Sequence, residues 1–139
     1  MIKTLKEAEK YGGVYIYTFA SQFKYKGDFP IKIGCTSHNI KSRIAAQGTG
    51  QYEKPLVLLI VAEDDKQKAI ELEKILHSAF IVWKNTPGKE WFKGTRYSLV
   101  KLLERLIELK KSVFADEVIL KDVFFEDYMD NYFENPLYQ

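Results

Sequence analysis

The sequence predicts an α/β fold: a small antiparallel sheet of three strands flanked by helices, with extra helices toward the C-terminus. Three observations lead to this prediction. Residues 14–19 alternate between two sets of side chains, as a strand with two distinct faces does. Residues 55–63 are apolar nearly throughout, which is typical of a central strand covered on both faces. Residues 66–84 carry apolar side chains at helical spacing.

The N-terminal half supplies two of the strands and two helices. Residues 3–10 are expected to form a short charged helix. The strand at residues 14–19 is followed by a polar loop and a second short strand at residues 31–34, which we expect to pair antiparallel with the first. Ser37 is then expected to cap a helix over residues 38–47. The faces of the first strand are Val14, Ile16 and Thr18 on one side and Tyr15, Tyr17 and Phe19 on the other.

The C-terminal half supplies the third strand and the remaining helices. The helix at residues 66–84 is stopped by a Pro-Gly pair, and a second helix is expected at residues 96–112. The apolar stripes are Ala69, Leu72, Leu76, Ala79, Phe80 and Trp83 in the first helix, and Leu99, Leu102, Leu103, Leu106 and Leu109 in the second. A last helix is expected from the spacing of Phe125, Tyr128, Met129 and Tyr132. This divides the chain into a domain at residues 1–114 and an acidic, aromatic tail at residues 115–139 that packs on the domain or on a partner.

The charge of the chain is unevenly distributed. Residues 115–139 hold seven acidic residues and one lysine, a net charge of −6, so the other 114 residues carry +8 of the total of +2. A basic body suggests a polyanionic partner such as nucleic acid, with a solvated lysine surface as the alternative. A single cysteine excludes an internal disulfide and fits the reducing cytoplasm, and no apolar run is long enough to span a membrane.

Glu73 fits its surroundings worst, because it borders the apolar stripe of its helix. A buried, unpaired carboxylate is unfavourable by several kcal/mol, so Glu73 lies at the edge of the stripe, meets a cation or binds a metal ion. Taken singly, His77 reads as a histidine at the edge of the core and Cys35 as a small buried residue. Lys32 alternates with Ile31 and Ile33, so its side chain leaves the face that they cover.

Five elements in a fixed order change this interpretation. They are Gly13-Val14-Tyr15, Lys32-Ile33-Gly34 with Thr36, Arg43, the segment from Glu73 to Phe80 that reads ExxLHxxF, and Glu90-Trp91-Phe92. The series resembles the GIY-YIG nuclease superfamily, closest to the phage-type branch whose second motif reads KIG. The resemblance covers roughly residues 12 to 93.

The resemblance implies a metal-dependent endonuclease that hydrolyses phosphodiester bonds in DNA with one divalent ion, Mg²⁺ or Mn²⁺. Glu73 matches the metal-binding glutamate, and Tyr15 matches the tyrosine taken as the general base for an attacking water. Lys32 stands where many members have tyrosine, where it could lower the pKa of Tyr15 or hold the water. Arg43 matches the arginine that contacts the phosphate.

Four further residues are expected to bind substrate or to position other groups, and they are Tyr17, Thr36, His77 and Glu90. One departure from the pattern is that Gln47 replaces the usual histidine one helical turn after Arg43. The alternative function is a nucleic-acid-binding or regulatory module of the same fold with little or no turnover. The acidic tail is expected to pack on the body or a second subunit in a homodimer, or to lie across the basic cleft and restrain cutting.

Overall fold

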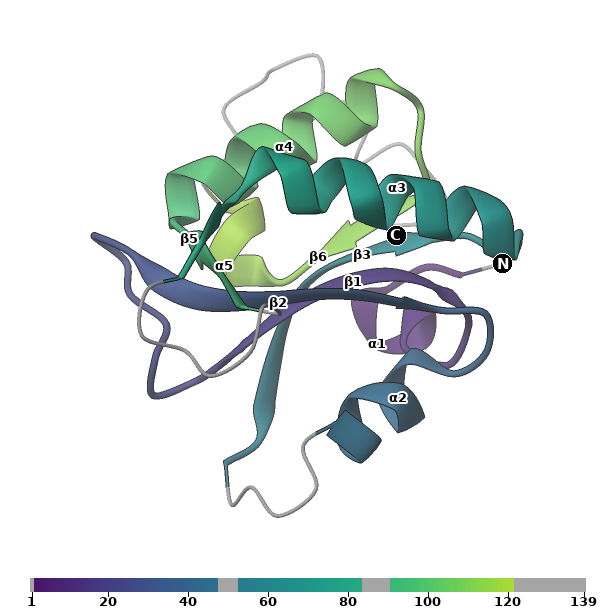
Figure 1. Cartoon of the computed structure of the whole chain (residues 1–139), viewed down its shortest axis with the longest axis horizontal. Coiled ribbons are helices and arrows are strands. Elements are labelled where there is room, and N and C mark those ends of the chain that lie inside the picture. Colours follow the sequence, from purple (N-terminus) through teal and green to yellow (C-terminus); the bar gives the residue numbers. More distant parts are fainter. Residues whose placement is uncertain (1, 48–52, 84–90, 122–139) are drawn as a thin grey trace.

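The computed structural model describes residues 2–47, 53–83 and 91–121 of the chain. In these residues a six-stranded antiparallel sheet lies between two layers of helices (Figure 1). The predicted α/β class with an antiparallel sheet and flanking helices is therefore confirmed. The predicted number of three strands is wrong.

The three predicted strands form the middle of the sheet, and three short strands extend it at both sides. The strand order is β4-β5-β2-β1-β3-β6. The strands are β1 (Gly13–Phe19), β2 (Phe29–Thr36), β3 (Pro55–Ala62), β4 (Ile81–Val82), β5 (Trp91–Gly94) and β6 (Val113–Ala115). The added strands have two, four and three residues, too few for an alternating pattern to stand out in the sequence.

The helices are shorter than their sequence patterns predict. They are α1 (Leu5–Ala8), α2 (Ile40–Gln47), α3 (Lys66–Ala79), α4 (Arg96–Glu108) and α5 (Glu117–Leu120). Helix α3, which was expected to continue to residue 84, ends at Ala79, and β4 begins at Ile81. Ala79 and Leu109, the last residues of α3 and of the apolar stripe predicted for α4, are exposed. Ser37 does not cap α2, because the Asn39 side chain accepts the backbone N–H of Ser42 at 3.0 Å.

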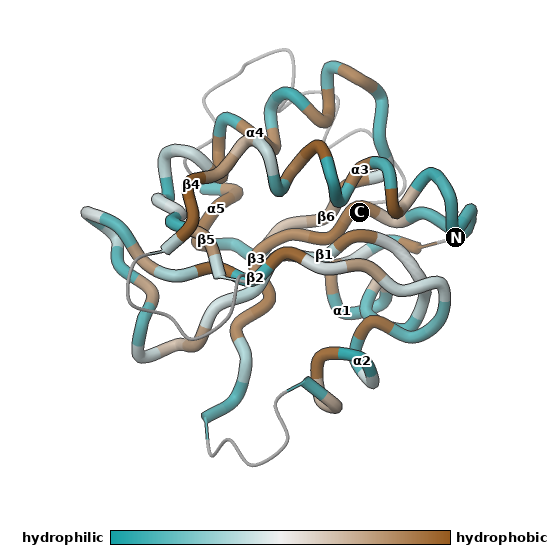
Figure 2. Tube along the Cα trace, viewed as in Figure 1, coloured by the Kyte–Doolittle hydropathy of each residue, from teal (hydrophilic) through white to brown (hydrophobic). Residues whose placement is uncertain are grey.

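Helices α3 and α4 cover one face of the sheet, and α1 and α2 cover the other (Figure 1). The predicted alternation of β1 is confirmed, since Val14 and Ile16 pack in the core under α3 and α4, while Tyr15 and Tyr17 pack under α1 and α2. The strands run as apolar segments through the middle, with hydrophilic residues on the outer turns (Figure 2). Because both faces of β1 are covered, every one of its residues is buried.

The end of the described chain is tied into this core. Strand β6 includes Ala115, the first residue of the expected tail, and pairs with β3. Asp116 caps α5 by accepting the backbone N–H of Val118 at 3.0 Å. The helix expected around Phe125 to Tyr132 lies outside the described residues. Within the described ranges, no helix combines the length and apolar character needed to cross a bilayer.

The place of β6 in the core gives a first prediction. Phe114 is 1% exposed, between β3 and the α1–α2 layer. Phe114→Ala is expected to lower the free energy of unfolding by about 3–5 kcal/mol, through lost burial and the cavity left behind. Urea denaturation measures this change. Leu109→Ala, at a half-exposed site just before β6, is the control and should stay within about 0.5 kcal/mol of wild type; equal effects would contradict a core role for β6.

Candidate functional site

A cleft of about 160 Å³ opens beside β2, near its pairing with β5. Among the described residues, Lys32 and Trp91 form the last pair of these two strands, and Ile33 and Gly34, which follow Lys32 in β2, line the cleft. The cleft is lined by Tyr15, Lys32, Ile33, Gly34, Cys35, Arg43, Gln47, Glu73 and His77. Side chains from both faces of the sheet therefore meet in this cleft.

The contact between Tyr15 and Gly34 is what brings the two faces together. The residues are directly opposite in the antiparallel pair of β1 and β2, so they share a face of the sheet. A Cβ atom on Gly34 would lie 2.5 Å from the Tyr15 hydroxyl oxygen. Only a residue without a side chain leaves room for the phenol to cross β2 and reach the cleft.

The Tyr15 hydroxyl is buried and, within the described chain, no protein group reaches it with hydrogen-bond geometry. Burial raises the pKa of Tyr15 above its ordinary value of 10.0, and the charge of Glu73 adds to the increase. Gln47 and Arg43 lie beside the phenol and partly oppose this shift. The phenol is therefore protonated at neutral pH, and Arg43 is the cation that acts on it.

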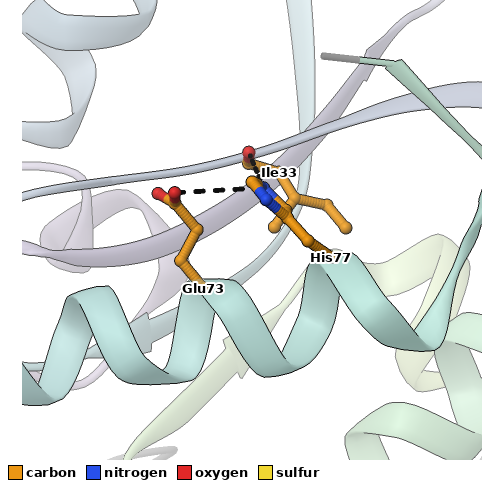
Figure 3. Close-up of polar contacts among 3 residues, drawn as sticks. All are labelled: Ile33, Glu73 and His77. Carbon is orange, nitrogen blue, oxygen red and sulfur yellow. Dashed lines mark hydrogen bonds and ion pairs between the residues drawn. The ribbon is translucent and has the colours of Figure 1, made fainter. Parts of the chain in front are cut away.

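Glu73 and His77 reach the cleft from α3, one helical turn apart (Figure 3). The His77 Nε2 lies 3.0 Å from the carbonyl oxygen of Ile33 and 3.9 Å from Glu73 Oε1. Because a carbonyl only accepts hydrogen bonds, Nε2 carries the proton. The His77 ring also stacks on Phe92, with 4.8 Å between ring centroids. His77 thus connects α3 to β2 at Ile33, one helical turn from Glu73.

The remaining predicted site residues are placed as follows. Lys32 lines the cleft, with its Nζ 5.9 Å from the centre of the Trp91 ring. Tyr17 packs against Tyr15 in the core, with ring centroids 6.1 Å apart. Thr36 does not line the cleft; its Oγ1 accepts the backbone N–H of His38 at 3.3 Å, in the turn before α2. Glu90 lies outside the described residues.

The structure adds two residues to the site that sequence reasoning did not assign to it. Gln47 follows Arg43 by one helical turn, and this spacing was the signal that could have placed it there. Cys35 borders the cleft from the α3 side. Burial, together with the nearby Glu73, raises the pKa of the Cys35 thiol to about 12, so the thiol remains protonated and is a poor nucleophile.

The donor set of the cleft fits a hard divalent ion held by one carboxylate. Glu73 is the carboxylate that lines it, with a side chain 24% exposed. No group of three or more His, Cys, Asp or Glu side chains in the described ranges is placed to hold a metal. Mg²⁺ needs no such cage, because it keeps several waters and is often bound by one or two carboxylates plus substrate phosphate.

Comparison with known proteins assigns the chain to a nuclease-like, DNA-binding class of domains. The particular family is that of the T5orf172 domain: its model matches residues 12–111, and the chain belongs to this family. The resemblance to the GIY-YIG superfamily is therefore wrong, since the matching model is that of a different family. No curated protein and no solved structure matches the chain.

Two of the five elements behind the mistaken assignment, the segments that contain Tyr15 and Gly34, have a structural origin in this sheet. Val14 and Tyr15 are ordinary residues for a buried strand, and Gly34 is required by the phenol that crosses it. Such tripeptides report the packing of two neighbouring strands. They do not by themselves separate one family from another.

The unpaired hydroxyl gives a second prediction. Tyr15→Phe removes a buried polar group without a protein partner and is expected to raise the free energy of unfolding by about 1 kcal/mol. Because burial raises the folded-state pKa, the unfolded phenol ionises first. Wild type should therefore lose stability relative to the variant as pH rises above about 10.

Urea denaturation of both proteins at neutral and alkaline pH measures this difference. The control is Tyr17→Phe, because the Tyr17 hydroxyl donates to Gln47 Oε1 at 3.4 Å. That variant should be no more stable than wild type. A destabilised Tyr15→Phe protein would show that the hydroxyl is satisfied in the folded state.

Proposed function

We propose that this domain is a metal-dependent endonuclease that hydrolyses phosphodiester bonds in DNA. One observation carries the proposal: Tyr15, Arg43 and Glu73, from three different elements, line one small cleft beside β2. In such a reaction a phenol can accept a proton, a guanidinium can bind a phosphate and a carboxylate can bind a cation. A binding module has no need of the carboxylate, which phosphate repels.

Arg43 and Lys32 supply the positive charge of the cleft. Arg43 is an exposed residue of α2 that lines the cleft, which supports a contact between its guanidinium and a phosphate from solvent. Its fork of donors suits the extra negative charge that a phosphate gains in the transition state. Lys32 lines the same cleft and adds a second cation beside the reacting group.

Tyr15 is the group proposed to accept the proton of an attacking water. In the free protein its phenol holds its proton, since burial raises the pKa. A general base must be deprotonated to act, so the phenol has to ionise before the water attacks. Arg43 already favours the phenolate, and its position beside the hydroxyl supports this role.

Glu73 is the residue that would hold Mg²⁺ or Mn²⁺. When bound, such an ion stabilises negative charge on the scissile phosphate and on the leaving oxygen. His77 supports this role indirectly, because its hydrogen bond to Ile33 and its stacking on Phe92 hold α3 against β2 and β5.

A second candidate is a DNA-binding module of the same fold without useful turnover. The raised pKa of Tyr15 favours this candidate, because a protonated phenol cannot take a proton from water. Both candidates bind DNA, so only a measurement of cleavage separates them.

The third prediction concerns cleavage. Wild type is expected to nick supercoiled plasmid in the presence of Mg²⁺, and Glu73→Gln should reduce the rate by about 100-fold or more. The loss reflects several kcal/mol of charge stabilisation that requires the carboxylate. Glu71→Gln, an exposed position on the same helix, is the matched control and should nick at the wild-type rate.

Two outcomes would contradict the proposal in different ways. Absence of Mg²⁺- or Mn²⁺-dependent nicking by wild type on supercoiled, linear and single-stranded DNA would favour the binding module. Equal rates for wild type and Glu73→Gln would show that Glu73 does not hold the ion.

A further inference from the structure

A second cavity, of about 550 Å³, lies on the opposite side of α2 from the cleft. It is lined by Lys3, Thr4, Leu5, Lys6, Glu9, Lys41, Lys54, Phe114, Ala115, Asp116 and Glu117. Its floor is apolar, from β6 and α1, and its four lysines are exposed. None of its lining residues is shared with the cleft.

Helix α2 stands between the two cavities and contributes a cation to each. Ile40 and Ile44 bury one side of α2 against the sheet. At 3.6 residues per turn, Lys41 and Arg43 then fall on opposite flanks of that buried stripe. Arg43 lines the cleft and Lys41 lines the second cavity. The helix contains no acidic residue that would repel a polyanion lying across it.

The second cavity is built from segments that are fixed to one another. The backbone N–H of Lys41 donates to the carbonyl of Glu9 at 2.8 Å, and that of Ile40 donates to Tyr11 at 3.1 Å. The start of α2 is therefore tied to the segment that follows α1. Lys6 and Lys41 are held on a common scaffold, which limits the entropy lost when their side chains meet a ligand.

The three carboxylates that line this cavity differ in how far they neutralise the positive charge of its lysines. Asp116 is engaged as the cap of α5, and Glu117 is exposed. Glu9 is partly buried among the lysines; burial raises the pKa of its carboxyl, while Lys41, Lys6 and Lys54 oppose that shift. In the free protein Glu9 thus acts as the counter-charge of the lysine cluster.

We propose that this lysine-lined cavity binds the phosphate backbone of the DNA that occupies the cleft, so that α2 lies between two contacted phosphates. The inference rests on the proposed function, since the cleft holds the reacting phosphate. A helix is about 10–12 Å wide with its side chains, and duplex DNA carries one charge per ~1.7 Å of axis. A duplex seated at the cleft therefore presents several further phosphates over the width of α2.

The fourth prediction tests this contact by its salt dependence. Each lysine that neutralises a phosphate contributes about 0.9 to the slope of log affinity against log salt concentration. The double variant Lys41→Gln, Lys54→Gln should lower that slope by about 1.8. The affinity advantage of wild type should then shrink by about tenfold between ~50 and ~200 mM salt. The measurement is fluorescence anisotropy with a short duplex and EDTA, so that no cleavage occurs.

The control is the pair Lys68→Gln, Lys101→Gln, at exposed lysines of α3 and α4 on the other side of the sheet. Its slope should equal that of wild type. The proposal is overturned if the Lys41 and Lys54 variant keeps the wild-type slope, as it would if the cavity served an acidic protein segment. It is also overturned if both pairs lower the slope equally, which would indicate non-specific attraction.

A variant that should bind duplex DNA more tightly than wild type provides an independent test. Glu9→Gln removes the counter-charge from among the lysines and should tighten duplex binding several-fold, since phosphate no longer meets a carboxylate there. Unchanged or weaker binding would contradict the placement of DNA in this cavity.

The binding measurements and the cleavage measurements test different claims, so either claim can be refuted without the other. Binding without divalent metal does not depend on Glu73, so an inactive wild type leaves the lysine result intact. In an active enzyme, the Lys41 and Lys54 variant should raise KM and leave kcat unchanged, because neither residue lines the cleft.

Discussion

The site depends on one close contact, in which the ring of Tyr15 crosses the backbone of Gly34. The register of β1 and β2 places these residues opposite each other, and the missing side chain at Gly34 leaves the passage open. A shift of that register by one residue would turn Tyr15 to the other face of the sheet. The central strand pair therefore determines both the fold and the position of the phenol.

Bringing the phenol of Tyr15 into the cleft lowers stability at that point. The Tyr15 hydroxyl is buried without a protein partner in the described chain. A buried polar group without a hydrogen bond is unfavourable for folding by about 1–3 kcal/mol. Local departures of this type are expected at functional sites, where the surrounding core supplies the stability that the site gives up.

The parts of the fold that could be predicted are those with a long periodic pattern. The alternation of β1 and the stripe of α3 were sufficient to place Tyr15, and to mark Glu73 as out of character. The outer strands could not be predicted, because β4, β5 and β6 are short and their residues become strands only by pairing with neighbours. The contact across Gly34 joins distant parts of the chain, so no local pattern reports it. The spacing along α2 puts Gln47 on the same flank as Arg43, but it does not indicate that Gln47 approaches Tyr15.

The contact between α3 and β2 explains why the site lies where it does. His77 reaches from α3 to the carbonyl oxygen of Ile33, with 3.0 Å between Nε2 and that oxygen. A side chain thereby satisfies a backbone acceptor of the strand, which a folded protein has to pair in one way or another. Because Glu73 and His77 are one helical turn apart on α3, the same hydrogen bond brings Glu73 to the cleft that Tyr15 lines. The charge of Glu73 then acts on the phenol and adds to the increase of its pKa.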